Sequence, residues 1–126
     1  MKANELMIGD WVTVRRPSNR REKVRVKSVI GNGTIEAKTK DGLVVFGELA
    51  VEPIPLTVEI LEKNGFERSK VFVEWKYEDD DVYMIYKPFP YLKIQMEECN
   101  IAFPCEYVHE LQHALRLCGI EIEIKL

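Results

Sequence analysis

Apolar and polar residues alternate along most of residues 8–49, which is the pattern of half-buried β-strands. The alternating segments are IGDWVTVRR, VRVKSVI, TIEAKT and LVVFGEL, and the turn-rich stretches PSNRRE, GNG and KDG separate them. The Asp41-Gly42 pair between two alternating runs is a strong hairpin signal. We therefore expect residues 1–52 to form a small β-barrel-like half of the Src-homology-3-like kind.

The pattern changes after the linker VEPIPL, whose prolines are incompatible with a helix. Thr57 can cap a short helix in TVEILEKNGF. KVFVEWKY and VYMIY, joined by the acidic turn EDDD, and then LKIQMEE predict three antiparallel strands. The face of the first strand expected to turn to the core holds Val71, Val73, Trp75 and Tyr77.

A C-terminal helix is predicted over residues 107–118, and the alternating tail IEIEIKL predicts a last strand. Residues 53–126 thus form an α+β half with a short helix, an antiparallel sheet and a C-terminal helix. The predicted fold class is α+β. We expect the two halves to share one core, as one compact domain.

The two ends of the chain differ in charge. Net charge is -3, yet residues 1–40 carry +6 and the remainder -9. Such asymmetry is a feature of proteins that bind nucleic acid. The basic loop that carries much of it contains the candidate nucleic-acid contacts Arg15, Arg16, Arg20, Arg21 and Lys23. The alternative is that this loop is only a solvated connection.

The sequence also bears on the cellular location of the protein. No apolar run is long enough to span a membrane, and Glu5 and Asp10 interrupt the N-terminal segment where a signal peptide needs an apolar stretch. We therefore expect a cytoplasmic protein with no membrane partner. In a reducing compartment the three cysteines, Cys99, Cys105 and Cys118, are expected to be free thiols.

The predicted C-terminal helix contains HELQH, a match to the H-E-x-x-H signature of zinc peptidases. In that chemistry His109 and His113 would bind the metal and Glu110 would act as the base. Helical periodicity places the apolar stripe of this helix toward the core and both histidines on its opposite, polar face. We expect that face to be solvated.

A third zinc ligand is difficult to find. The chain has two histidines, so the extended three-histidine form is excluded, and Arg116 and Gly119 occupy its remaining positions. A Cys2His2 site using Cys99 and Cys105 would have a non-standard spacing. The chain also lacks G-x-S-x-G, C-x-x-C and a phosphate-binding glycine loop. We therefore expect no cofactor, no metal and no catalytic residue.

Three stretches, in order along most of the chain, are ELMIGDWV, PIPLTVEILEKNGF and YVHELQHALRLCGIEIEI. They resemble a family of short uncharacterised proteins of gut bacteria, often found on prophages and other mobile elements. Its members typically show E-L-x-I-G-N-x-V, P-I-P-L-T and Y-V-H-x-L-Q-N segments. Here His113 and Asp10 stand where that pattern has Asn. The resemblance implies that H-E-x-x-H is completed only locally, and it carries no known activity.

These observations favour a non-catalytic binding or adaptor protein. Its candidate partners are nucleic acid, reached through the basic loop, or another protein. The alternative is a zinc-dependent hydrolase that uses HELQH, with His109 and His113 as ligands and Glu110 as base.

Overall fold

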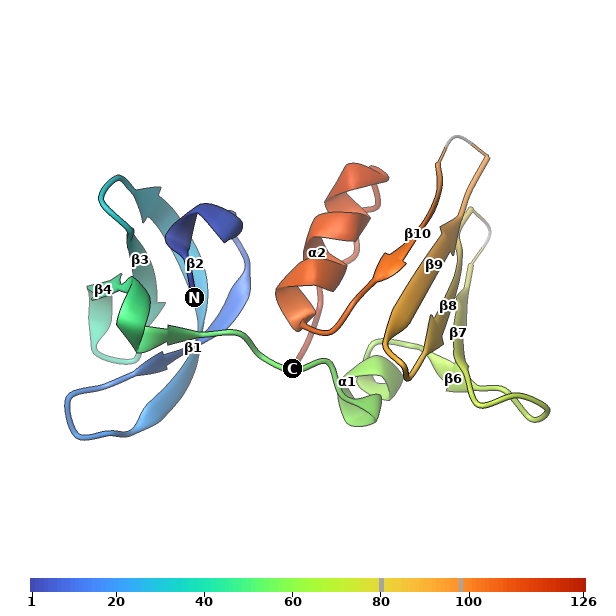
Figure 1. The fold of residues 1–126 in the computed structure, drawn as a ribbon, viewed down its shortest axis with the longest axis horizontal. Helices are drawn as coiled ribbons and strands as arrows, with labels where there is room; N and C mark the ends of the chain where they lie inside the picture. The colour runs from blue at the N-terminus through green and yellow to red at the C-terminus, as the bar shows by residue number, and fades with distance from the viewer. Residues whose placement is uncertain (80, 98) are drawn as a thin grey trace. The chain divides into compact units, whose positions relative to one another are not determined.

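The structure, a computed structural model, describes residues 1–79, 81–97 and 99–126, and the chain divides into two compact units. Unit 1 consists of Met1–Pro55 with Tyr107–His113, and unit 2 of Leu56–Glu106 with Ala114–Leu126. The predicted α+β class is confirmed, because the described residues form two antiparallel sheets and two α-helices (Figure 1). Within the described ranges, no helix has the length and apolar character needed to cross a membrane.

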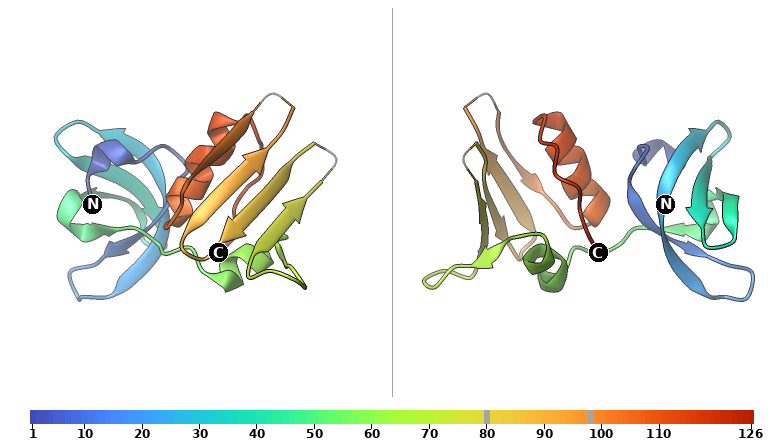
Figure 2. Two further views of the ribbon diagram at one scale, coloured as in Figure 1. Left: turned by 45° about the vertical axis from the view of Figure 1, so that its right-hand side comes forward. Right: turned by 180° about the vertical axis from the view of Figure 1, so that it is seen from behind.

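Unit 1 is built on a five-stranded antiparallel sheet with the strand order β4-β3-β2-β1-β5. Its strands are β1 (Trp11–Arg15), β2 (Arg21–Ile30), β3 (Thr34–Thr39), β4 (Gly42–Gly47) and β5 (Val51–Glu52). Two short 3-10 helices, η1 (Ala3–Glu5) and η2 (Glu48–Ala50), complete the unit. The blue-to-green ribbons of Figure 2 show that this sheet is strongly curved. The four strands expected from alternation are all present.

Alternation also explains the core of unit 1. Alternate residues of β1 and β3, together with Val24 and Val26 of β2 and Phe46 of β4, point inward and bury almost all of their surface. The strand residues of this cluster are Val12, Val14, Val24, Val26, Ile35, Ala37, Phe46 and Val51. The hairpin predicted at Asp41-Gly42 is confirmed, because β3 and β4 pair from Thr39↔Gly42 onward and Gly42 has φ +105°.

Unit 2 contains a second antiparallel sheet with the order β10-β9-β8-β7-β6. Its strands are β6 (Glu67–Arg68), β7 (Trp75–Glu78), β8 (Tyr83–Lys87), β9 (Tyr91–Gln95) and β10 (Asn100–Pro104). Helix α1 (Val58–Lys63) begins as predicted at Thr57, whose hydroxyl accepts a hydrogen bond from the backbone N–H of Ile60 at 3.3 Å. Asp80 of the acidic turn, and Glu98 at the end of the predicted segment LKIQMEE, lie outside the described residues.

The first predicted strand of unit 2 is wrong in its N-terminal half. Val71 and Val73, which were expected in the core, are 80% and 60% exposed. The Ser69 hydroxyl accepts hydrogen bonds from the backbone N–H groups of Val71 and Phe72, both at 3.3 Å. This local turn competes with strand pairing, so the strand begins only at Trp75, which is buried as predicted.

The predicted C-terminal strand is absent from the described residues 120–126. Ile120 and Ile124 are buried, as the alternation suggested. The backbone of Lys125, however, is bound by one side chain instead of a neighbouring strand. The Asn64 amide donates to the Lys125 carbonyl at 2.7 Å and accepts from its N–H at 2.7 Å. The tail is therefore anchored without joining a sheet.

The prediction of three free thiols is wrong for two of them. Cys99 and Cys118 form a disulfide, with their Cα atoms 5.6 Å apart, within the ordinary range for such bonds. Cys99 precedes β10, and Cys118 directly follows α2 (Val108–Leu117). Sequence spacing could not show this proximity, because the fold creates it. Cys105 is fully buried and forms no disulfide, as expected.

Candidate nucleic-acid interface

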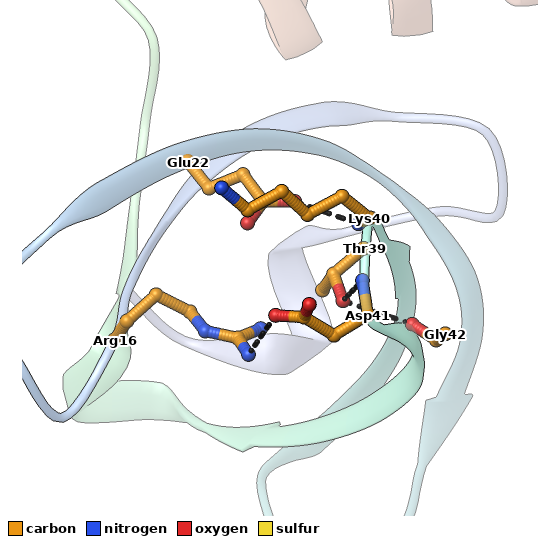
Figure 3. Close-up of polar contacts among 6 residues, drawn as sticks. All are labelled: Arg16, Glu22, Thr39, Lys40, Asp41 and Gly42. Carbon is orange, nitrogen blue, oxygen red and sulfur yellow. Dashed lines mark hydrogen bonds and ion pairs between the residues drawn. The ribbon is translucent and has the colours of Figure 1, made fainter.

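The basic loop joins β1 to β2, and the pair Arg15↔Arg21 closes the hairpin. Arg16 does not face solvent with the others. Its Nη2 lies 3.0 Å from Oδ2 of Asp41, its guanidinium lies 5.8 Å from the centre of the Phe46 ring, and its side chain is 15% exposed. Figure 3 shows the Arg16 guanidinium pointing at the Asp41 carboxylate. Arg16 therefore fastens the β1–β2 hairpin to the β3–β4 turn and is a poor candidate for a ligand contact.

Two further loop cations also have partners within unit 1. Arg15 donates from Nη2 to the carbonyl of Leu49 at 2.7 Å, and Arg21 forms an ion pair with Glu52 at 3.1 Å. Both arginines remain exposed. Arg20 and Lys23 are exposed as well. The five predicted contacts are thus not equivalent, and four of them stay at the surface.

Strand register places additional cations beside these four. The side chains of β1, β2 and β3 that alternate with the core residues point outward, and they belong to one sheet. We call this surface the basic face. Its cations are Arg15, Arg21, Lys23, Arg25, Lys27 and Lys38, and its carboxylates are Glu36 and Glu52. Cations therefore outnumber carboxylates on this face.

One cross-strand row of the basic face carries an aromatic ring. Trp11 of β1 is the register partner of Arg25 of β2, and Arg25 is the partner of Lys38 of β3. Lys38 is in turn the partner of Leu43 of β4, which is 59% exposed. The Arg25 guanidinium lies 4.9 Å from the centre of the Trp11 ring, a cation–π contact.

Sequence reasoning missed Arg25, Lys27 and Lys38 as members of this surface. Trp11 is half-buried and faces outward, whereas its neighbour Val12 is fully buried. A usable signal was present, since Lys23, Arg25 and Lys27 occur at every second position of a predicted strand. The prediction grouped cations that are close together in the sequence and did not use the strand register.

The polar face of helix α2 is only partly solvated, so the prediction of a solvated face is wrong for His109 and Gln112. His109 and Gln112 are both 6% exposed. The Gln112 side chain accepts from the backbone N–H of Trp11 at 2.9 Å and donates to the carbonyl of Gly9 at 3.1 Å. The amide thus satisfies one donor and one acceptor next to β1. A polar residue with such partners can be buried at little cost.

The remaining polar residues of HELQH also have structural contacts. Asp10 is fully buried; its Oδ2 lies 2.6 Å from Nε2 of His113 and accepts from the backbone N–H of Met7 at 2.8 Å. Glu110 accepts from the backbone N–H of Tyr107 at 2.9 Å, which is the reciprocal half of a helix capping box. The nitrogen of His113 that faces Asp10 and the Glu110 carboxylate are therefore engaged within unit 1.

His109, Glu110 and His113 of the zinc motif line one pocket, together with Glu5. The volume of this pocket is about 730 Å³. Burial lowers the pKa of His109, and the nearby Asp10 carboxylate opposes part of that shift. Among the residues that the structure describes, no three His, Cys, Asp or Glu side chains converge as a metal-binding group.

Comparison of the chain with protein-family models, with curated proteins and with solved structures gives no match in any of the three. The functional interpretation therefore depends on the geometry of unit 1. Unit 1 has an outward, net-positive sheet face on β1, β2 and β3, and a buried polar segment in helix α2.

Proposed function

We propose that this protein is a non-catalytic binding or adaptor module that contacts the phosphate backbone of nucleic acid through the basic face of unit 1. The observation that carries the proposal is the register of β1, β2 and β3. It gathers cations from three strands onto one surface, including Lys23, Lys27 and Lys38, which are all exposed. Clustered, exposed cations on one sheet are the electrostatic footprint of a nucleic-acid partner.

The proposal treats unit 1 as a small barrel of the Src-homology-3-like kind. Two features support this assignment. The strands β1 to β4 pair in sequence order, and β5 returns to pair with β1. The 3-10 helix η2 stands between β4 and β5 and lets the chain turn back to β1. A barrel of this kind offers its outward strand faces and hairpins to a partner.

We further propose the cellular setting that the sequence suggested. The resemblance to proteins of prophages and mobile elements, and a cytoplasmic location, are both consistent with access to nucleic acid. A reducing compartment would favour free thiols at Cys99 and Cys118, whereas the structure has them joined by a disulfide. Because both cysteines belong to unit 2, the basic face of unit 1 does not depend on the bond.

The rival function is a zinc-dependent hydrolase. The engagement of His113 by Asp10 and of Glu110 by the Tyr107 N–H supports the non-catalytic proposal. Zinc analysis of tag-free protein purified without chelator tests the rival, with His113→Asn as control. About one zinc per chain in the wild type and none in the variant would overturn the proposal.

The direct test is the salt dependence of binding, measured by fluorescence anisotropy with a labelled oligonucleotide. We expect affinity to fall steeply between about 50 and 200 mM salt. Replacing one phosphate contact, Lys23→Ala, should reduce the slope of log K against log salt by about one. The matched control is Lys70→Ala, an exposed lysine of unit 2. Binding that is absent, or insensitive to salt, would contradict the proposal.

A further inference from the structure

We infer that unit 2 binds the surface of an anionic lipid bilayer through an apolar tip at one end of its sheet. The β6–β7 loop and the β8–β9 turn form this tip, and its large side chains are between 60% and 80% exposed: Val71, Phe72, Val73 and Phe89. A cluster of large exposed apolar residues marks a contact with a membrane or a partner. The contact is peripheral and departs from the expectation of no membrane partner. It is independent of the proposed function, which concerns unit 1.

Strand register brings the two parts of the apolar tip to the same end of the sheet. Arg68 of β6 pairs with Trp75 of β7, so the β6–β7 loop leaves the sheet at this row. Trp75 pairs in turn with Tyr86 of β8. The β8–β9 turn begins beyond the next pair, Lys87↔Tyr91. Figure 1 shows the loop and the turn at this end of the sheet. Because neighbouring strands are about 4.8 Å apart, both parts can reach one flat surface together.

The β6–β7 loop binds much of its own backbone. The Ser69 hydroxyl accepts hydrogen bonds from the N–H groups of Val71 and Phe72. The Phe72 carbonyl accepts from the N–H of Glu74 at 2.9 Å, and the Glu74 carbonyl accepts from the N–H of Ser69 at 2.9 Å. An apolar phase offers no water to free backbone groups, so each of them is costly there. These internal hydrogen bonds therefore lower the cost of moving the loop into a bilayer surface.

The β8–β9 turn has few backbone donors for a different reason. Phe89 lies between Pro88 and Pro90, and proline has no backbone N–H. The Pro90 carbonyl accepts from the N–H of Cys105 at 3.3 Å. The Phe89 ring stacks on Tyr91 at 6.5 Å and is still 75% exposed. A protein interface supplies hydrogen-bond partners and ordered water, whereas hydrocarbon supplies neither. The scarcity of free backbone donors around this ring therefore favours lipid over a protein partner.

The charges of unit 2 are arranged to suit an anionic bilayer. Residues 68–74 and 87–90, which form the tip, carry one carboxylate and three cations: Arg68, Lys70 and Lys87. The carboxylate, Glu74, is buried and lies 3.8 Å from the ammonium of Lys76. The turns at the opposite end of the sheet carry exposed carboxylates: Glu78, Asp79, Asp81 and Glu97. With the tip at the bilayer, the cations are near the anionic surface and these carboxylates are farther from it.

Co-sedimentation with sucrose-loaded vesicles tests the inference. The vesicles are phosphatidylcholine alone, or phosphatidylcholine mixed with phosphatidylglycerol. We expect the wild type to bind the mixed vesicles and to bind pure phosphatidylcholine more weakly. Phe72→Ser with Phe89→Ser should weaken binding by at least about tenfold, because two apolar rings no longer enter the lipid. The matched control is Leu49→Ser, at an 89% exposed position of unit 1, which should bind like the wild type. These side chains are all exposed, so thermal melts should be unchanged.

Adsorption through the basic face of unit 1 is the competing explanation for vesicle binding. Lys23→Glu with Lys27→Glu separates the two surfaces, because in this background the serine substitutions should still weaken binding about tenfold. Phe72→Trp, which keeps an aromatic ring at the tip, should bind at least as well as the wild type. Binding that survives the serine substitutions would overturn the inference. So would a wild type that binds neither kind of vesicle, or both kinds equally.

Discussion

The HELQH segment and the basic face belong to the same unit, yet they use their polar side chains in opposite ways. Within HELQH, Gln112 and His109 are buried, and His113 and Glu110 contact groups of their own unit. On the basic face, Lys23, Lys27 and Lys38 point outward. A match to a sequence motif therefore does not indicate a function until the contacts of its residues are known. The residues that match the catalytic signature make contacts within unit 1, whereas the lysines of the basic face are exposed.

The largest expected effect tests the structural role of the buried carboxylate. Asp10→Ala removes the partner of both His113 and the Met7 N–H. We expect the free energy of unfolding to fall by about 3 kcal/mol, because a buried charged group is lost and its partners are left unsatisfied. Urea denaturation measures the change. The control Glu52→Ala, which breaks the exposed pair with Arg21, should cost less than about 1 kcal/mol. Equal losses in the free energy of unfolding for the two variants would show that the Asp10 contacts are no more important to stability than an exposed ion pair.

Gln112 should show the next largest effect. Gln112→Ala removes two hydrogen bonds and leaves the Trp11 N–H and the Gly9 carbonyl without that partner. The expected loss is about 2 kcal/mol in the free energy of unfolding, again from urea denaturation. Leu117→Ala, at a 74% exposed position of α2, is the control and should change stability by roughly 0.5 kcal/mol or less. A Gln112 variant as stable as this control would show that the HELQH face is not a structural contact.

A pH series separates His109 from the other residues. Burial lowers the pKa of His109 in the folded chain, while Asp10, Glu110 and Glu5 oppose the shift and His113 adds to it. As pH falls through the ordinary histidine pKa of about 6.5, the unfolded chain takes up a proton that the folded chain does not. The free energy of unfolding should therefore decrease on acidification, and less so in His109→Gln. Urea midpoints at several pH values measure this. Parallel pH profiles for the two proteins would refute it.

The smallest effect on stability is expected on the basic face. Lys23→Glu with Lys27→Glu changes two exposed side chains and should alter the free energy of unfolding by roughly 0.5 kcal/mol or less per site. A thermal melt is sufficient to check this. A large loss of stability would mean that these lysines, like HELQH, have partners inside the protein, and the contrast between the two regions would disappear.

Strand alternation predicted unit 1 well because each strand has one buried and one exposed face. The same reasoning was wrong for the helix, since it treated every polar position as solvent-facing. Gln112 and His109 violate that rule because the chain near β1 meets that helix face, and its Gly9 and Trp11 backbone groups bond to Gln112. Such contacts join residues about a hundred positions apart. Periodicity within one element cannot reveal them.

Unit 2 shows two other limits of sequence reasoning. The run KVFV has the composition of a strand, but the Ser69 hydroxyl holds it in a turn, and Phe72 is 65% exposed. Cys99 and Cys118 are 19 positions apart, and nothing in that spacing predicts their bond. Both outcomes depend on a local hydrogen bond or on a tertiary approach. Hydropathy patterns contain neither.

We propose that the basic face binds nucleic acid, whereas the HELQH segment stabilises unit 1. The most direct test measures oligo(dT) affinity by anisotropy for Lys23→Glu/Lys27→Glu and for Asp10→Asn, each under conditions where it is folded. We expect the lysine variant to lose more than about tenfold in oligo(dT) affinity, with unchanged stability. We expect Asp10→Asn to keep its oligo(dT) affinity and to lose stability. A lysine variant that binds like the wild type, or an Asp10→Asn protein that is stable but no longer binds, would contradict it.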